Sequence, residues 1–100
     1  MENKDSCDMH LVDQGKDVAG DLDPGDFYFL TDGRGQQMFH TCLPNGTGLA
    51  IPLRPLVDPK INGGHSWAWD GNKDKPTLSP SINAQGIWHG WVRAGRMESC

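Results

Sequence analysis

Imidazole and thiol side chains offer the most chemistry in this chain, which has 4 histidines and 3 cysteines. A structural zinc site needs about four such ligands in a closed tetrahedral arrangement. His40, Cys42 and His89 are weak candidate ligands, because all three can face one side of a predicted sheet. The sequence contains no C-x-x-C pair. We therefore predict no metal site and no cofactor, with zinc as the alternative. The remaining histidines and cysteines are Cys7, His10, His65 and Cys100.

Nucleophilic catalysis would require a thiol or hydroxyl beside a base and an orienting partner. Cys42 has His40 two residues away, but residues at that spacing on a strand are neighbours by default. Ser79 and Ser81 lack a G-x-S-x-G elbow. The prolines around them favour hydroxyls that bond the backbone in a turn. The sequence thus predicts no catalytic residue.

Four tryptophans form the other notable constellation. Trp67 and Trp69 are two residues apart, so an extended chain points both to one side. A small β domain with few aliphatic residues needs such rings for its core, and tryptophan is also enriched in binding hot spots. An exposed pair would form a partner surface. The predicted partner-binding residues are Trp67, Trp69, Asp70, Lys75, Pro76, Thr77, Ser79 and Trp88.

The segment W-A-W-D-G-N-K-D-K-P-T-L-S-P-S-I, residues 67–82, is followed by W-H-G-W-V-R-A-G-R, residues 88–96. Over residues 39–98 the chain resembles a family of small proteins found mostly in bacteriophages and prophages. Its members share W-x-[WF]-[ND]-G-x-x-x-x-P-T-x-S-P-S-I and often carry the automatic label "ammonia monooxygenase", which these residues do not support. Many relatives have cysteine where Trp88 stands, so the resemblance carries no complete zinc site to this chain.

The elements that must position these residues are short strands. Asp26–Thr31 is rich in aromatic residues and precedes a glycine-containing turn, and Gln36–Leu43 is the predicted return strand. Asn45-Gly46 is a strong hairpin signal before a third strand, Gly48–Leu53. These segments predict a three-stranded antiparallel meander.

The second half of the chain continues this pattern. Residues 54–64 form a connector with prolines and glycines. Pro76 and Pro80 remove backbone donors, which predicts a sheet edge or ordered loop around Thr77–Ser79 rather than a central strand. Gly86–Arg93 and Arg96–Ser99 are further strand candidates. With no helical stripe, we predict an all-β fold, either a small antiparallel sandwich or a partly open barrel of five to seven short strands with an extended N-terminal arm.

Length and composition limit the remaining possibilities. One hundred residues suit one domain, predicted as residues 26–100 behind a polar N-terminal arm, residues 1–25. A net charge of −4 with scattered basic residues argues against nucleic-acid binding. No apolar run long enough for a membrane span and no signal peptide are evident. An odd number of cysteines without an export signal predicts free thiols.

These observations predict a non-enzymatic binding protein of a bacteriophage. Its most concrete form is a virion-associated protein, such as a capsid decoration protein, located in the virion or the host cytoplasm. The expected partners are viral capsid or tail subunits or further copies of the chain, with no nucleic acid and no membrane. The alternatives are an intracellular phage factor that binds a host protein, such as a defence inhibitor, and a small zinc-binding domain.

Overall fold

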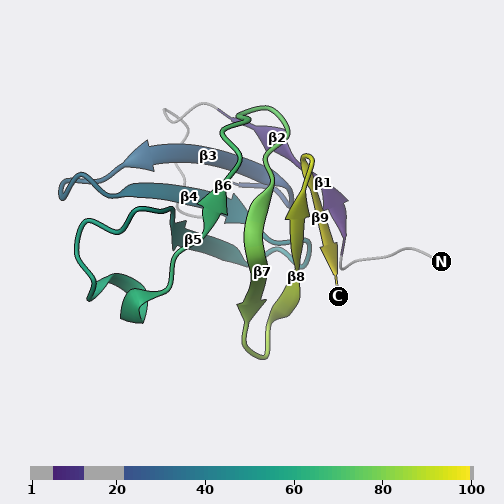
Figure 1. The fold of residues 1–100 in the computed structure, drawn as a ribbon. Helices are drawn as coiled ribbons and strands as arrows, with labels where there is room; N and C mark the ends of the chain where they lie inside the picture. The colour runs from purple at the N-terminus through teal and green to yellow at the C-terminus, as the bar shows by residue number, and fades with distance from the viewer. Residues whose placement is uncertain (1–5, 13–21, 100) are drawn as a thin grey trace.

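The computed structural model describes residues 6–12 and 22–99 and is all-β, with two sheets that do not close into a barrel (Figure 1). One sheet has the order β2-β3-β4-β5, and the other has the order β1-β9-β8-β7-β6. The strands of the two sheets cross at a steep angle (Figure 1). The all-β prediction is confirmed. The strands are β1 (Cys7–Asp8), β2 (His10–Leu11), β3 (Asp26–Thr31), β4 (Gln37–Cys42), β5 (Gly48–Pro52), β6 (Ala68–Trp69), β7 (Leu78–Ala84), β8 (Trp88–Arg93) and β9 (Arg96–Ser99).

The predicted meander is β3, β4 and β5, paired antiparallel in that order. Phe39 lies opposite Phe29 on one side and Ile51 on the other, which places large apolar residues in register across the sheet. The Asn45-Gly46 turn closes with a bond from the Leu43 N–H to the Thr47 carbonyl, 2.8 Å. The short-range turn chemistry and the alternation of apolar residues were therefore sufficient to predict these three strands of the sheet.

The N-terminal segment contributes two of the nine strands in the described part of the chain, which exceeds the predicted five to seven. β1 pairs antiparallel with β9, and β2 pairs parallel with β3. Between them Met9 is buried in the core. One buried side chain and two short pairings thus order residues 7–11, a part of the chain whose polar composition predicts a solvated arm, while residues 1–5 and 13–21 of that predicted arm lie outside the described residues.

The prediction of an edge or loop around Thr77–Ser79 is wrong, because β7 lies between β6 and β8. Leu78 pairs with Val92 and Ile82 with Gly90, so the register shifts between them. This irregularity gives β7 extra residues relative to β8, as in a β-bulge. Pro80 falls inside it, where a missing N–H removes no regular ladder bond.

The core lies between the two sheets and combines aliphatic and aromatic side chains. Segment 66–69 links the sheets through its main chain: the Trp67 N–H donates to the Pro52 carbonyl at 3.1 Å, and the Arg54 N–H donates to the Trp67 carbonyl at 2.9 Å. A four-residue 3₁₀ turn, η1 (Ile61–Gly64), precedes that segment. No helix suited to crossing a bilayer occurs in the described residues. The buried apolar cluster is Met9, Phe27, Phe39, Leu43, Ile51, Leu53, Leu78, Ile82, Trp88, Val92 and Met97.

Candidate active site

A serine hydroxyl and an imidazole meet on the outer face of the five-stranded sheet. Ser81 Oγ on β7 lies 3.3 Å from His89 Nε2 on β8. This distance is slightly longer than the range of about 2.6–3.2 Å expected for a nucleophile and its base, which is often looser in the absence of substrate. When the imidazole carries its proton on Nδ1, Nε2 accepts the hydrogen bond from the serine hydroxyl. A serine paired in this way can be deprotonated as it attacks an acyl group.

Strand alternation explains why both groups face solvent. On β8, Trp88, Gly90 and Val92 are buried, so His89 between them points outward. On β7, Ile82 is buried and pairs with Gly90, which places Ser81 on the same outer face. The register shift that ends at Ile82 also sets the position of Ser81 along the strand. Bulges near functional sites re-aim a side chain in this way.

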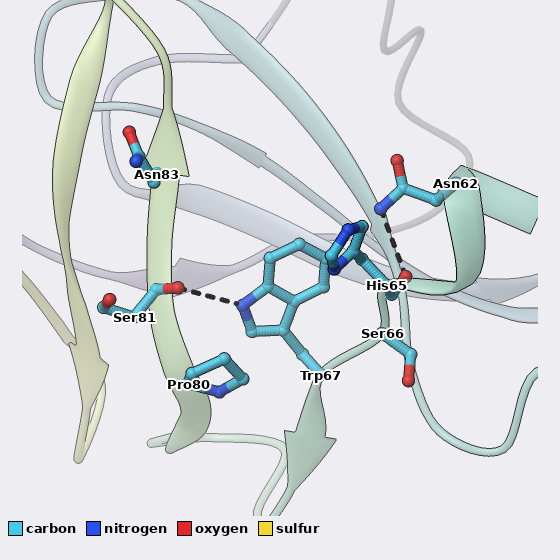
Figure 2. Close-up of a pocket in the computed structure, with 7 residues that line it drawn as sticks. All are labelled: Asn62, His65, Ser66, Trp67, Pro80, Ser81 and Asn83. Atoms are coloured by element: carbon cyan, nitrogen blue, oxygen red, sulfur yellow. Dashed lines mark hydrogen bonds between the residues drawn. The ribbon is translucent and has the colours of Figure 1, made fainter.

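A cavity of about 400 Å³ lies beside Ser81 (Figure 2). Trp67 forms one wall, and its indole N–H donates to the Ser81 carbonyl at 3.4 Å. The bond between the Asn62 side-chain amide and the His65 carbonyl, 3.1 Å, holds the turn on the far side. The lining residues are Asn62, His65, Ser66, Trp67, Pro80, Ser81 and Asn83.

The site has the parts of a serine hydrolase dyad. Ser81 Oγ is a hydroxyl that can act as a nucleophile, His89 Nε2 can act as its base, and Ser81 also lines the cavity. No carboxylate among the described residues is hydrogen-bonded to His89, so the third member of a triad is not seen there. Serine hydrolases also occur with catalytic groups other than Ser-His-Asp.

The thiols do not compete for this role. Cys7 and Cys42 are free, in agreement with the sequence prediction, while Cys100 lies outside the described residues. Burial raises the pKa of the Cys42 thiol, and the charges of Asp26 and Asp23 raise it further. Burial also raises the pKa of Cys7, against the opposing charge of Arg96. Raised pKa values keep both thiols protonated and poorly nucleophilic at neutral pH.

The three weak metal candidates do not converge. His40 and Cys42 lie on β4 of the four-stranded sheet, whereas His89 lies on the outer face of the other sheet. His40 stacks against Tyr28 with ring centroids 4.8 Å apart, and burial lowers the pKa of the imidazole. No cluster of three metal-ligating groups occurs within the described residues.

The eight predicted partner-binding residues do not form one exposed surface. Trp88 and Pro76 are buried, whereas Asp70, Lys75 and Ser79 are exposed. The other three are half-buried and already hydrogen-bonded. The Trp67 indole N–H donates to the Ser81 carbonyl, and the Trp69 indole N–H donates to the Asn72 carbonyl at 3.0 Å. The Thr77 hydroxyl accepts from the Ala94 N–H at 2.9 Å. Their role in binding a partner stays a prediction, and of this set Trp67 lines the cavity.

A family model described as "Bacterial ubiquitination-like system serine protease (BubE)" matches residues 13–100. The chain belongs to the BubE family. The match includes all of β7 and β8 and therefore both members of the dyad. No match was found among curated proteins or among solved structures.

Membership of the BubE family corrects the sequence-based interpretation. The assignment to an uncharacterised bacteriophage family and the prediction of a virion or phage accessory protein are wrong, as is the prediction that the chain is not an enzyme. The alternative function, a small zinc-binding domain, is wrong for the same reason. Ser81 was missed because its only sequence signal was a serine directly after Pro80, and the hydroxyl that we expected to bond a turn meets His89 instead. A serine and a histidine on adjacent strand candidates could have revealed the pair.

Proposed function

We propose that this chain is a serine hydrolase of a bacterial ubiquitination-like system, with Ser81 as nucleophile and His89 as general base. The observation that carries the proposal is the contact between Ser81 Oγ and His89 Nε2. The description of the BubE family supports it independently. The bond cleaved is an amide or an ester. It either joins a protein of that system to another molecule or joins that protein to a segment at its own end.

The reaction follows from this geometry. His89 Nε2 takes the hydroxyl proton as Ser81 Oγ attacks the substrate carbonyl, which forms a tetrahedral intermediate. His89 then gives that proton to the departing amine or alcohol, which leaves an acyl-serine. Water attacks the acyl-serine with His89 again as base, and the carboxylic acid is released. The cavity beside Ser81 holds the substrate while these steps occur.

A fluorophosphonate tests the proposal without knowledge of the natural substrate. Ser81 Oγ would form a bond to phosphorus while fluoride leaves, and intact mass would show one adduct that maps to Ser81. Ser81→Ala should abolish labelling, and His89→Gln should slow it by about 100-fold or more, the usual contribution of a general base. Ser99→Ala, at an exposed serine outside the cavity, is the matched control and should label normally. An adduct on another residue, or undiminished labelling of Ser81→Ala, would refute the proposal.

A further inference from the structure

One side of β7 is covered along only part of its length. β6 pairs with Leu78 and Ser79 and with no later residue of β7. β8 covers the other side as far as Ala84. In the described part of the chain, no strand pairs with the free side of β7 beyond Ser79. The cavity beside Ser81 opens at this uncovered stretch (Figure 2).

The hydrogen-bonding direction of each β7 residue follows from two bonds. The Ala84 carbonyl accepts from the Ile87 N–H at 2.8 Å, so the main-chain groups of Ala84 face β8. Successive residues of a strand direct their main-chain groups to opposite sides, so Asn83 faces away from β8. Ser81 is two residues before Asn83, so its main-chain groups also face away from β8. Its carbonyl accepts from the Trp67 indole on the side away from β8, which agrees with this assignment.

Asn83 and Ser81 differ in what occupies that side. The Ser81 carbonyl is already bonded to Trp67, whose ring stands beside the strand (Figure 2). No described group bonds the main-chain N–H or carbonyl of Asn83 on that side. Asn83 therefore presents one unbonded main-chain donor and one unbonded main-chain acceptor at the edge of the sheet. An added strand pairs with such groups.

We infer that the substrate of Ser81 is an extended polypeptide segment that pairs with Asn83 on the uncovered side of β7. This inference rests on the proposed hydrolase function. Trp67 stops the segment from continuing beside Ser81 in the plane of the sheet, so the chain turns onto the outer face. Ser81 Oγ and His89 lie on that face. The scissile carbonyl then lies on the outer face, beyond the paired residue.

The cavity also restricts the side chains of this segment. None of its described lining residues is Asp, Glu, Lys or Arg. The Trp67 indole and Pro80 give it apolar walls, and Asn62 and Asn83 supply neutral amides. The His65 imidazole lines the cavity as well, and no carboxylate, ammonium or guanidinium group among the described lining residues can pair with a charge, so we expect the side chain next to the scissile bond to be uncharged. Because the segment must be extended, it is a terminal tail or a linker rather than part of a folded domain.

Peptide phosphonates test this inference on the unmodified protein. The probe is acetyl-tetraalanine ending in a diphenyl phosphonate, in which Ser81 Oγ bonds to phosphorus, phenol leaves and His89 transfers the proton. A series carries one N-methyl group at each amide in turn. We expect one position to lower the labelling rate roughly three- to tenfold, as for the loss of one hydrogen bond, and its two neighbours to have little effect. Equal rates for all methylated probes would overturn the inference.

Two variants test the other hydrogen bond of this pair, in which the Asn83 main-chain N–H donates to a carbonyl of the probe. Asn83→Pro removes that N–H without removing a β7–β8 bond, and should lower the labelling rate of the unmethylated probe roughly three- to tenfold, whereas the methylation effect, which reports on the Asn83 carbonyl, should remain. Asn83→Ala keeps the N–H and should keep the original labelling rate. If Asn83→Pro does not fold, the methylated series decides alone. Failure of the fluorophosphonate to label Ser81 would refute the hydrolase function. If the fluorophosphonate labels Ser81 but the labelling rate of the peptide phosphonates does not depend on which amide is methylated, only the strand pairing is refuted.

Discussion

Gly90 provides the sharpest test of how the fold positions the dyad. It follows His89 on β8 and faces the core between Trp88 and Val92. A Cβ at this position would collide with the Trp88 ring and with the Glu98 carbonyl of β9. The Trp88 side chain can rotate, but the carbonyl belongs to the β8–β9 ladder. Gly90→Ala must therefore displace β8 and the histidine that it carries.

The expected loss is at the upper end of the range for overpacking. Extra methyl groups in a packed core cost about 1–3 kcal/mol, and a fixed main-chain oxygen leaves little room for relaxation. We therefore expect the free energy of unfolding to fall by about 3 kcal/mol or more. For a domain of this size that corresponds to a decrease in Tm of roughly 12–24 °C.

Urea unfolding followed by tryptophan fluorescence measures this change. Gly33→Ala is the matched control, because no atom lies within 4 Å of its added Cβ. The double variant Gly90→Ala/Trp88→Leu should not recover the original stability, since the Glu98 carbonyl remains in place. A stability of Gly90→Ala within about 0.5 kcal/mol of the unmodified protein would show that β8 adapts and that our account of the strand is mistaken.

Two further predictions concern Trp67 and His40. Trp67→Phe keeps a ring beside β7 but removes the N–H that bonds the Ser81 carbonyl, so fluorophosphonate labelling should slow by roughly two- to tenfold; an unchanged rate would show that this bond does not position the nucleophile. Burial lowers the pKa of His40 below 6.5, so as pH falls through that value the unfolded chain binds a proton that the folded chain does not, and stability decreases. Urea midpoints at about pH 7.5 and about pH 5.5 should therefore differ less in His40→Gln than in the unmodified protein, and an equal difference in both would contradict this sign.

The sequence was most informative where local rules determine structure. The alternation around Phe39 and Ile51 and the Asn45-Gly46 turn predicted the meander that the structure contains. The strand predicted over Gly86–Arg93 is also present as β8, where Trp88 and Val92 are buried and His89 is exposed. These features depend on period-two patterns and turn chemistry, which are properties of short segments.

The candidate site could not be predicted in the same way, because it depends on a register between strands. Ser81 faces His89 only because β7 shifts its pairing between Leu78 and Ile82. The prolines suggested an interruption of pairing, and Pro80 does lie in the irregular stretch, whereas Pro76 precedes β7. They do not indicate that the strand resumes beyond it. A serine without a recognised elbow motif therefore carried no catalytic signal until its neighbour across the sheet was known.

The β7–β8 hairpin carries both reactive groups on either side of one short turn. Gln85, Gly86 and Ile87 in that turn are exposed, so a chain break there would divide the protein into a piece with the serine and a piece with the imidazole. Neither piece alone would hold a dyad. Hydrolysis would return only when the two pieces reassemble, which makes this turn a natural place to build a split enzyme whose activity reports on proximity.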